Sequence, residues 1–150
     1  LDIDVHHGNG TQNIFYDRDD VLTISLHADT ARFYPFFWGN AHERGSGRGS
    51  GFNLNIPMPR HTADATYLDA LKMALEHINL FGADVIVVAL GLDAFIHDPF
   101  EGLAITTGGF QKIAEAISDL GRPMALVQEG GYLSDELGQN LCSFLAGVRV

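Results

Sequence analysis

The sequence predicts an α/β fold in which a mostly parallel sheet is flanked by helices. Short apolar runs alternate along the chain with segments whose apolar residues recur every three or four positions, which is typical of this class. At 150 residues, the chain has the length of one domain with a sizeable core. The predicted elements are strands over 1–5, 21–26, 84–90 and 124–128, and helices over 62–81, 107–120 and 135–147.

Two of the predicted strands have distinct patterns. In the first, Leu1, Ile3 and Val5 alternate with polar residues, as in an extended segment with two different faces. The run over 85–90 is instead continuously aliphatic and rich in β-branched residues. We therefore expect a parallel strand that is covered on both faces.

Three segments have helical periodicity, and glycine follows two of them. Gly82 and Gly121 fit the ends of the first two helices, and Cys142, the only cysteine, lies in the third. A single cysteine excludes an internal disulfide and a multi-thiolate zinc site, and we expect this thiol to be buried. The apolar faces are Leu68, Leu71, Leu75 and Ile78; Phe110, Ile113, Ile117 and Leu120; and Leu137, Leu141, Phe144 and Leu145.

The composition argues against two kinds of partner. A net charge of −10 disfavours direct binding to nucleic acid or to an anionic membrane surface. No apolar run reaches the roughly 18 residues of a membrane span, and we expect a cytoplasmic protein. The glycine-rich loop over 39–51 lacks the G-x-G-x-x-G pattern and precedes an apolar run, so it does not predict dinucleotide binding. Its charged residues are expected to be solvated: His42, Glu43, Arg44 and Arg48.

Carboxylates and imidazoles gather where the predicted strands end. Asp4 and His6 are two residues apart in an extended segment, so their side chains are expected on the same side. Asp93 follows the aliphatic strand by three residues, and Tyr132 follows two glycines after the last strand. Functional loops of parallel α/β sheets cluster at the carboxyl ends of strands. Two carboxylates and one imidazole suit Zn²⁺ and leave coordination positions open.

These motifs, in this order, strongly resemble the zinc-dependent histone deacetylase and acetylpolyamine amidohydrolase superfamily. The resemblance extends over essentially the whole chain, and the HHGNGTQ spelling is closer to the class II members. It implies an arginase/deacetylase-like fold, with residues 1–150 as the C-terminal portion of a catalytic domain that is incomplete on its N-terminal side. The motifs are DVHHGNGTQ (4–12), ISLH (24–27), FYP (33–35), GFNLNIP (51–57), GLDAFIHDP (91–99) and QEGGY (128–132).

The resemblance also implies a role for individual residues. Asp4, His6 and Asp93 are the implied zinc ligands, and Tyr132 is the implied catalytic residue, whose hydroxyl donates to the oxyanion. His7 is expected either to support this centre or to pack under the turn. The other implied sites are a substrate channel with Phe33, Tyr34 and Gly131, and a K⁺ site with Asp2, Ser25 and Leu26.

The implied activity is hydrolysis of an acetylated amine, either an acetyl-lysine peptide or an acetylpolyamine, to free amine and acetate. The zinc ion polarises the acetyl carbonyl and lowers the pKa of water. In this superfamily a tandem histidine upstream of the Asp2 strand transfers the proton. None of the remaining histidines occupies that motif, so we expect the isolated chain to be impaired: His27, His42, His61, His77 and His97.

Two other interpretations remain open at this point. A non-catalytic metal-binding fragment or scaffold is consistent with the missing tandem histidine. A ureohydrolase with two Mn²⁺ ions is less favoured, because it needs a D-x-H-x-D style run, whereas residues 2–6 read DIDVH. The sequence does not specify the oligomeric state or the physiological substrate.

Overall fold

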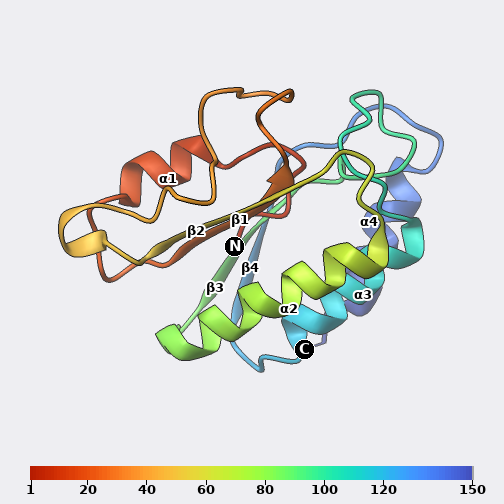
Figure 1. Ribbon diagram of the computed structural model, residues 1–150. Coiled ribbons are helices and arrows are strands. Elements are labelled where there is room, and N and C mark those ends of the chain that lie inside the picture. The colour runs from red at the N-terminus through yellow and green to blue at the C-terminus, as the bar shows by residue number, and fades with distance from the viewer. Residues whose placement is uncertain (150) are drawn as a thin grey trace.

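The computed structural model describes residues 1–149 and confirms the α/β class. All four strands pair in parallel, with α1 on one side of the sheet and α2 and α3 on the other (Figure 1). The elements are α1 (Asn9–Phe15), β1 (Thr23–Ala28), the short 3₁₀ helix η1 (Gly47–Gly49), β2 (Asn53–Met58), α2 (Asp64–Phe81), β3 (Ile86–Leu90), α3 (Thr107–Ser118), β4 (Met124–Gln128) and α4 (Leu137–Gly147).

Asp2 joins the two strand pairs at the centre of the sheet. It forms one parallel bridge to Ser25 of β1 and another to Ala89 of β3, which gives the spatial order β2–β1–Asp2–β3–β4. The prediction of a regular strand over 1–5 is therefore wrong in extent. The chain bends after the bridge, because Asp4 Oδ1 accepts a hydrogen bond from the His6 amide at 2.8 Å.

The predicted elements differ from the observed ones mainly at their ends. β4 has the predicted bounds, whereas β1 begins and ends two residues later, and α2 and α4 each begin two residues later. Two elements, α1 and β2, were not predicted from the sequence. α1 has seven residues with little apolar periodicity, and β2 carries two asparagines that face a buried polar network.

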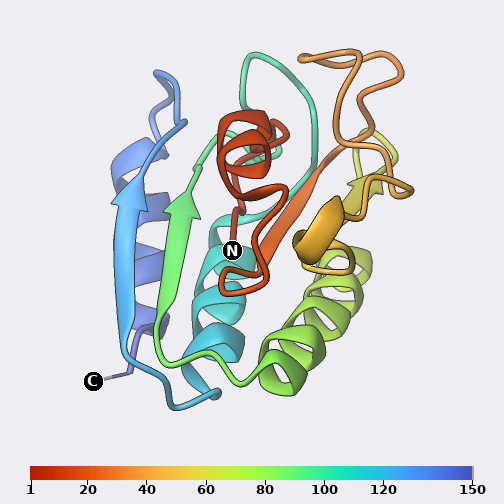
Figure 2. The same cartoon turned by 90° about the vertical axis from the view of Figure 1, so that its left-hand side faces the viewer.

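The two faces of the sheet are covered unequally. α2, α3 and α4 pack over one face, whereas the short α1 lies in front of the other and leaves β3 and β4 uncovered (Figure 2). Val88 is fully buried, but its neighbour Val87 is 53% exposed, and Val85 and Val127 are also exposed. Among residues 1–149, nothing covers this side of β3, so the expectation of a strand buried on both faces is wrong here.

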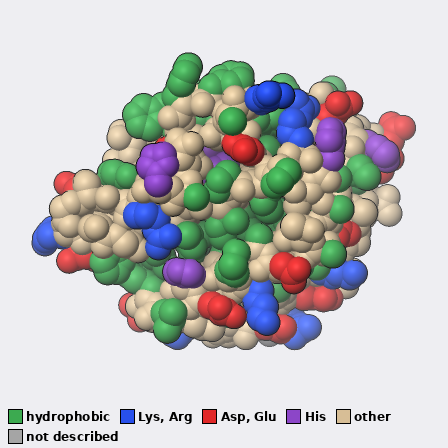
Figure 3. Space-filling model, viewed as in Figure 1, with side chains coloured by type: hydrophobic (Ala, Val, Ile, Leu, Met, Phe, Trp, Pro, Cys, Tyr) green, Lys and Arg blue, Asp and Glu red, His purple; other side chains and the backbone are tan. Residues whose placement is uncertain are grey.

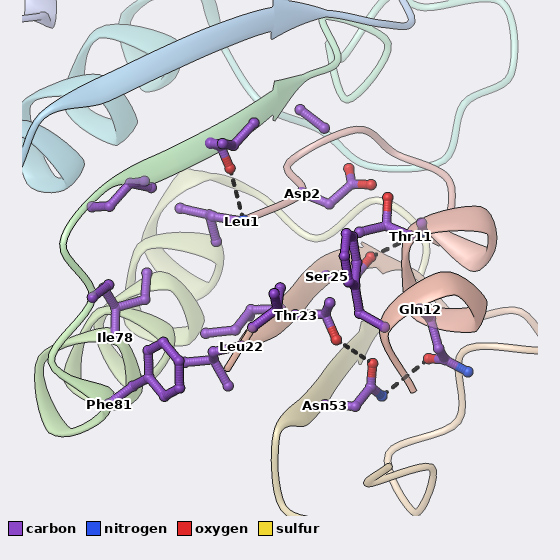
Figure 4. Close-up of a pocket in the computed structure, with 18 of the residues that line it drawn as sticks. Leu1, Asp2, Thr11, Gln12, Leu22, Thr23, Ser25, Asn53, Ile78 and Phe81 are labelled. Carbon is purple, nitrogen blue, oxygen red and sulfur yellow. Dashed lines mark hydrogen bonds between the residues drawn. The ribbon is translucent and has the colours of Figure 1, made fainter. Parts of the chain in front are cut away.

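A cavity of about 750 Å³ opens beside the uncovered face (Figure 4). Leu1, Leu22 and Phe81 line its apolar end, while Asp2 and Ser25 line the polar end near α1. The Leu1 amino group donates to the Val87 carbonyl oxygen at 2.9 Å, which holds the first residue along β3. This cavity therefore connects the apolar sheet surface with the central bridge.

Two features of the described residues bear on the expected partners. Within the described residues, no helix combines the length and apolar character that a membrane crossing requires. Acidic and basic side chains are interspersed on the face seen in Figure 3. Cys142 is exposed, contrary to expectation, because the buried stripe of α4 consists of Asn140, Phe144 and Gly147.

The unequal coverage predicts different effects at two neighbouring valines. Val88→Thr in the 150-residue chain places a hydroxyl in the core and should lower the free energy of unfolding by about 1–3 kcal/mol. Val87→Thr should change it by less than about 0.5 kcal/mol, because that side chain is half exposed. Urea unfolding of both variants checks this, and equal losses would show that the outer face is also covered.

Candidate metal centre

Asp4, His6 and Asp93 come together at the edge of the sheet where β3 ends. One ligand atom from each lies within 4.8 Å of the other two. His6 Nδ1 lies 2.9 Å from Asp4 Oδ1 and 3.2 Å from Asp93 Oδ2. Asp93 is fully buried, whereas the His6 side chain is 21% exposed. The cluster therefore has one side that solvent and small molecules can reach.

Main-chain amides hold both carboxylates in place. The Val5 amide donates to Asp93 Oδ1 at 3.0 Å, and the Gly130 amide donates to Asp4 Oδ2 at 2.9 Å. Each bond joins segments that are far apart in the chain. The turn after β4 and the segment after Asp2 are thereby locked to the same pair of acidic side chains.

Two glycines allow the backbone to approach the carboxylates this closely. A Cβ atom on Gly130 would overlap Oδ2 of both Asp93 and Asp4, and one on Gly91 would overlap the Asp4 backbone. Glycine is required at these positions because of close approach rather than an unusual φ angle.

The donor set fits a divalent cation. Asp93 Oδ2 is buried and accepts no hydrogen bond from the described residues, although an unpaired buried carboxylate oxygen is costly. Burial and the nearby charge of Asp4 raise the pKa of Asp93. Burial lowers the pKa of His6, but the nearby carboxylates of Asp4 and Asp93 outweigh this and raise it to about 9. The site thus favours a positive charge, and carboxylate with imidazole suits Zn²⁺.

Aromatic rings surround His6 on several sides. Phe33 stacks on it with ring centroids 5.2 Å apart, and Phe100 meets it edge-on at 5.6 Å. Phe100 also packs edge-on against Tyr132 at 4.7 Å. Sequence analysis missed Phe100, since no motif spacing distinguishes it from an ordinary loop residue.

The cluster faces a cavity of about 430 Å³, which Asp4, His6, Gly130 and Tyr132 help to line. Tyr132 is 42% exposed. This arrangement brings a phenol and the candidate metal ligands to one solvent-accessible space.

The two other residues expected in a channel differ in their surroundings. Tyr34 is exposed and lies edge-on to His6 with ring centroids 5.9 Å apart. Gly131 has φ +141°, and its α-carbon faces Leu92 and Leu137. Tyr34 therefore borders the aromatic group around His6, whereas Gly131 contacts apolar side chains behind the turn.

The residues expected to bind K⁺ lie side by side at the central bridge. The Leu26 amide donates to the Asp2 carbonyl oxygen at 3.0 Å, and Asp2 Oδ1 accepts from the Asp4 amide at 3.0 Å. Ser25 Oγ lies 2.8 Å from His27 Nδ1. Burial raises the pKa of Asp2 to about 7, so the carboxylate lies in a setting that a cation would stabilise.

His7 belongs to a buried polar network rather than to the metal cluster. Its ring packs against His27 at 4.8 Å, and its Nε2 lies 3.0 Å from Gln12 Oε1. Gln12 Oε1 also accepts from the side-chain amides of Asn53 and Asn55. Of the two interpretations of His7, packing under the turn matches these contacts.

Glu43 anchors the glycine-rich loop to this network, so its expected solvation is wrong. Its carboxylate accepts from Gln12 Nε2 at 2.6 Å, from the Gly39 amide at 3.0 Å, and from both nitrogens of Asn40. Although desolvation raises the pKa of Glu43, these hydrogen bonds outweigh it and lower the pKa to about 2. No local sequence signal reveals the role, because Gln12 is 31 positions away.

The fold is a parallel α/β sheet, and two carboxylates and one imidazole lie at the edge where its strands end. Proteins of this class are able to hold a metal ion in an open site. Comparison with known proteins identifies the particular family. The histone deacetylase domain family matches residues 1–148. The chain therefore belongs to this family.

Acetylpolyamine amidohydrolases are among the most similar relatives. The chain is 44% identical to acetylpolyamine amidohydrolase 2 of Pseudomonas aeruginosa over 149 residues, which cover 99% of the chain and 43% of the relative. It is 45% identical to acetylpolyamine amidohydrolase of Mycoplana ramosa over 148 residues, with coverage of 99% and 43%. The chain thus spans less than half the length of these relatives.

Solved structures confirm the fold. The crystal structure of acetylpolyamine aminohydrolase from Burkholderia pseudomallei superposes with a TM-score of 0.95 at 43% identity, over 98% of this chain and 43% of the other. An HDAC homologue complexed with SAHA gives a TM-score of 0.88 at 32% identity, over 99% of this chain and 41% of the other.

The tight contact at Gly130 predicts a loss of metal binding on substitution. Gly130→Ala should weaken Zn²⁺ binding at least about 10-fold, because the new methyl group displaces Asp4 and Asp93. Gly138→Ala is the matched control, since a Cβ there meets nothing within 4 Å. Competition with a zinc-binding dye measures both affinities; equal affinities would mean that the carboxylates tolerate displacement.

The Glu43 network predicts a pH-dependent stability difference. Glu43→Gln should lower the free energy of unfolding by about 1–2 kcal/mol at pH 7, because an amide cannot accept all of these bonds. The pKa of Glu43 is lowered in the folded state, so the contribution is present above about pH 4.5 and is lost as pH falls toward 2. Urea unfolding against pH checks this.

Glu115→Gln is the control, since Glu115 accepts one side-chain bond from its helix neighbour Gln111. A difference between wild type and Glu43→Gln that stayed constant down to pH 2 would contradict the predicted role of the carboxylate.

Proposed function

We propose that the protein containing this chain is a zinc-dependent deacetylase. It hydrolyses an acetylated primary amine, an acetyl-lysine side chain or an acetylpolyamine, to the free amine and acetate. The observation that carries the proposal is the cluster of Asp4, His6 and Asp93, of which Asp4 and His6 line the same cavity as Tyr132. The names of the similar proteins, acetylpolyamine amidohydrolase and histone deacetylase-like amidohydrolase, support this reaction class.

Asp4, His6 and Asp93 would hold the zinc ion. Their two negative charges would offset the 2+ charge, and the exposed side of His6 leaves access for substrate. When bound, Zn²⁺ supplies Lewis-acid polarisation of a carbonyl and activation of water. The Val5 and Gly130 amides keep both carboxylates fixed, so little reorganisation is needed on metal binding.

The other roles follow from the surroundings of the cluster. The Tyr132 hydroxyl would donate a hydrogen bond to the acetyl oxygen as negative charge develops on it. Phe33 and Tyr34, which pack around His6, would contact the alkyl arm of the substrate and exclude water. Asp2, Ser25 and Leu26, which lie side by side at the central bridge, would hold a K⁺ ion.

Residues 1–150 would form part of the catalytic domain. They span about 43% of the relatives' length, and the uncovered face of β3 and β4 would be covered by another part of the longer protein. We assign proton transfer to a histidine pair in that other part. The chain alone should therefore lose roughly 10²–10⁴-fold in rate, as expected when a general base is absent.

The proposed role of Tyr132 predicts a catalytic defect without a metal defect. In the longer protein, Tyr132→Phe should lower kcat about 10²–10³-fold, because one donor to the oxyanion is lost. Zinc content should stay unchanged, since the phenol is not a ligand. Turnover of an acetylated diamine and an acetyl-lysine peptide, with metal analysis, measures both effects.

Tyr16→Phe is the control, because Tyr16 lies just beyond α1 and outside the cluster. Full activity of Tyr132→Phe would remove the tyrosine from the mechanism. Stoichiometric zinc in the wild-type longer protein, with no turnover of either substrate, would instead identify a non-catalytic metal-binding protein.

A further inference from the structure

We propose that Arg60 is a positioning residue that fastens the two aromatic walls around His6 to each other and thereby sets the substrate entrance. This inference rests on the proposed deacetylase function. One wall is Phe33, and the other is Phe100 on the turn over 98–102. The side chain of Arg60 contacts both.

Arg60 reaches the second wall through the backbone. Its Nη2 donates to the carbonyl oxygens of Phe100 and Glu101, each at 3.1 Å, and its Nε donates to Glu101 at 3.2 Å. Among the described residues, Arg60 forms no salt bridge. Its charge is therefore directed at these two carbonyls, and charge-assisted bonds of this kind are stronger than neutral ones.

The same guanidinium lies over the first wall. Arg60 Cζ is 5.6 Å from the centre of the Phe33 ring, within the range of a cation–π contact. Phe33 also lies against the backbone of Gly102, where a Cβ atom would come within 2.9 Å of the ring. Arg60 thus covers the point where the two walls meet.

The turn that Arg60 holds has an unfavourable backbone. Glu101 has φ +50°, which a residue with a side chain seldom adopts. Asp98 secures the turn from the inside, because its side chain accepts from the Phe100 amide at 2.9 Å. Arg60 secures the carbonyls on the outside. Without Arg60, the carbonyl oxygens of Phe100 and Glu101 would lose these hydrogen bonds. The backbone of Glu101 would then relax from its positive φ angle and move Phe100.

Movement of Phe100 would reach the reacting groups. Phe100 contacts both His6 and Tyr132, and Phe33 stacks on the other side of His6. Among residues 1–149, the hydrogen bonds of the Arg60 side chain go to Phe100 and Glu101, and its ring contact is with Phe33. Its effect therefore passes through Phe100 and Phe33.

A lysine cannot replace this arginine fully. The planar guanidinium presents several donors in fixed directions and stacks on a ring at the same time, whereas an ammonium is a single point charge. The chain provides a matched control in Arg18, which pairs with Asp20 and lies 5.3 Å from the Phe15 ring. Arg18 is another exposed arginine that combines polar bonds with a ring contact, and it is absent from both the metal cluster and its cavity.

The test compares Arg60→Met, Arg60→Lys and Arg18→Met in the zinc-loaded longer protein. Backbone hydrogen exchange of residues 96–103 reports on the turn, and should be at least about fivefold faster in Arg60→Met. KM for a short acetylated diamine should rise about tenfold, while kcat falls less than about threefold, because the walls bind the substrate arm before and during reaction. Arg60→Lys should be intermediate, and Arg18→Met should match wild type.

Unchanged exchange at 96–103, or a KM within about twofold of wild type in Arg60→Met, would overturn the proposal. Equal effects in Arg18→Met would also overturn it, because they would show that removing the charge of any exposed arginine changes exchange and KM in the same way. If Arg60→Met does not fold, the same comparisons with Arg60→Lys decide. If wild-type protein hydrolyses no acetylated amine, the proposed function fails, and hydrogen exchange alone still decides whether Arg60 holds the turn.

Discussion

Two buried carboxylates are held beside one imidazole by amides from opposite ends of the chain. The Gly130 amide binds Asp4, and the Val5 amide binds Asp93. These hydrogen bonds depend on the register of the sheet. The bridges of Asp2 to β1 and β3 place Asp4 within reach of the turn after β4. Burying like charges together is costly unless cations or donors compensate. The fold therefore concentrates acidic charge at one point and supplies only part of the compensation from its own amides.

The uncovered sheet face and the candidate metal centre lie next to each other. The cavity beside β3 and the cavity at the cluster share five lining residues: Asp2, His7, Gly8, Thr11 and Ala89. Whatever covers the exposed valines of β3 would therefore also border the carboxylate of Asp2. The open sheet face and the candidate metal centre are therefore adjacent, and the bridge at Asp2 lies between them.

The sequence predicted what depends on spacing and strand ends, and it missed what depends on distant contacts. The sequence placed Asp4 and His6 together at the end of the first apolar run and Asp93 just after the third, and the structure brings the three within one cluster. α1 and β2 have weak local patterns, and their polar residues gain partners only in the network around Gln12. The exposure of Val87 was not predictable either, since local periodicity does not reveal what covers a strand.

Two charged residues, Glu43 and Arg60, hold loops in this structure. Glu43 accepts hydrogen bonds from the loop after residue 38, and Arg60 donates to the turn over 98–102. Both bind backbone groups rather than an opposite charge. Surface loops contain little apolar core to hold them, and a charged side chain supplies several directional hydrogen bonds at one point. Each of these two charges therefore contributes chiefly by holding a loop: Glu43 binds the segment at Gly39 and Asn40, and Arg60 binds the turn that carries Phe100.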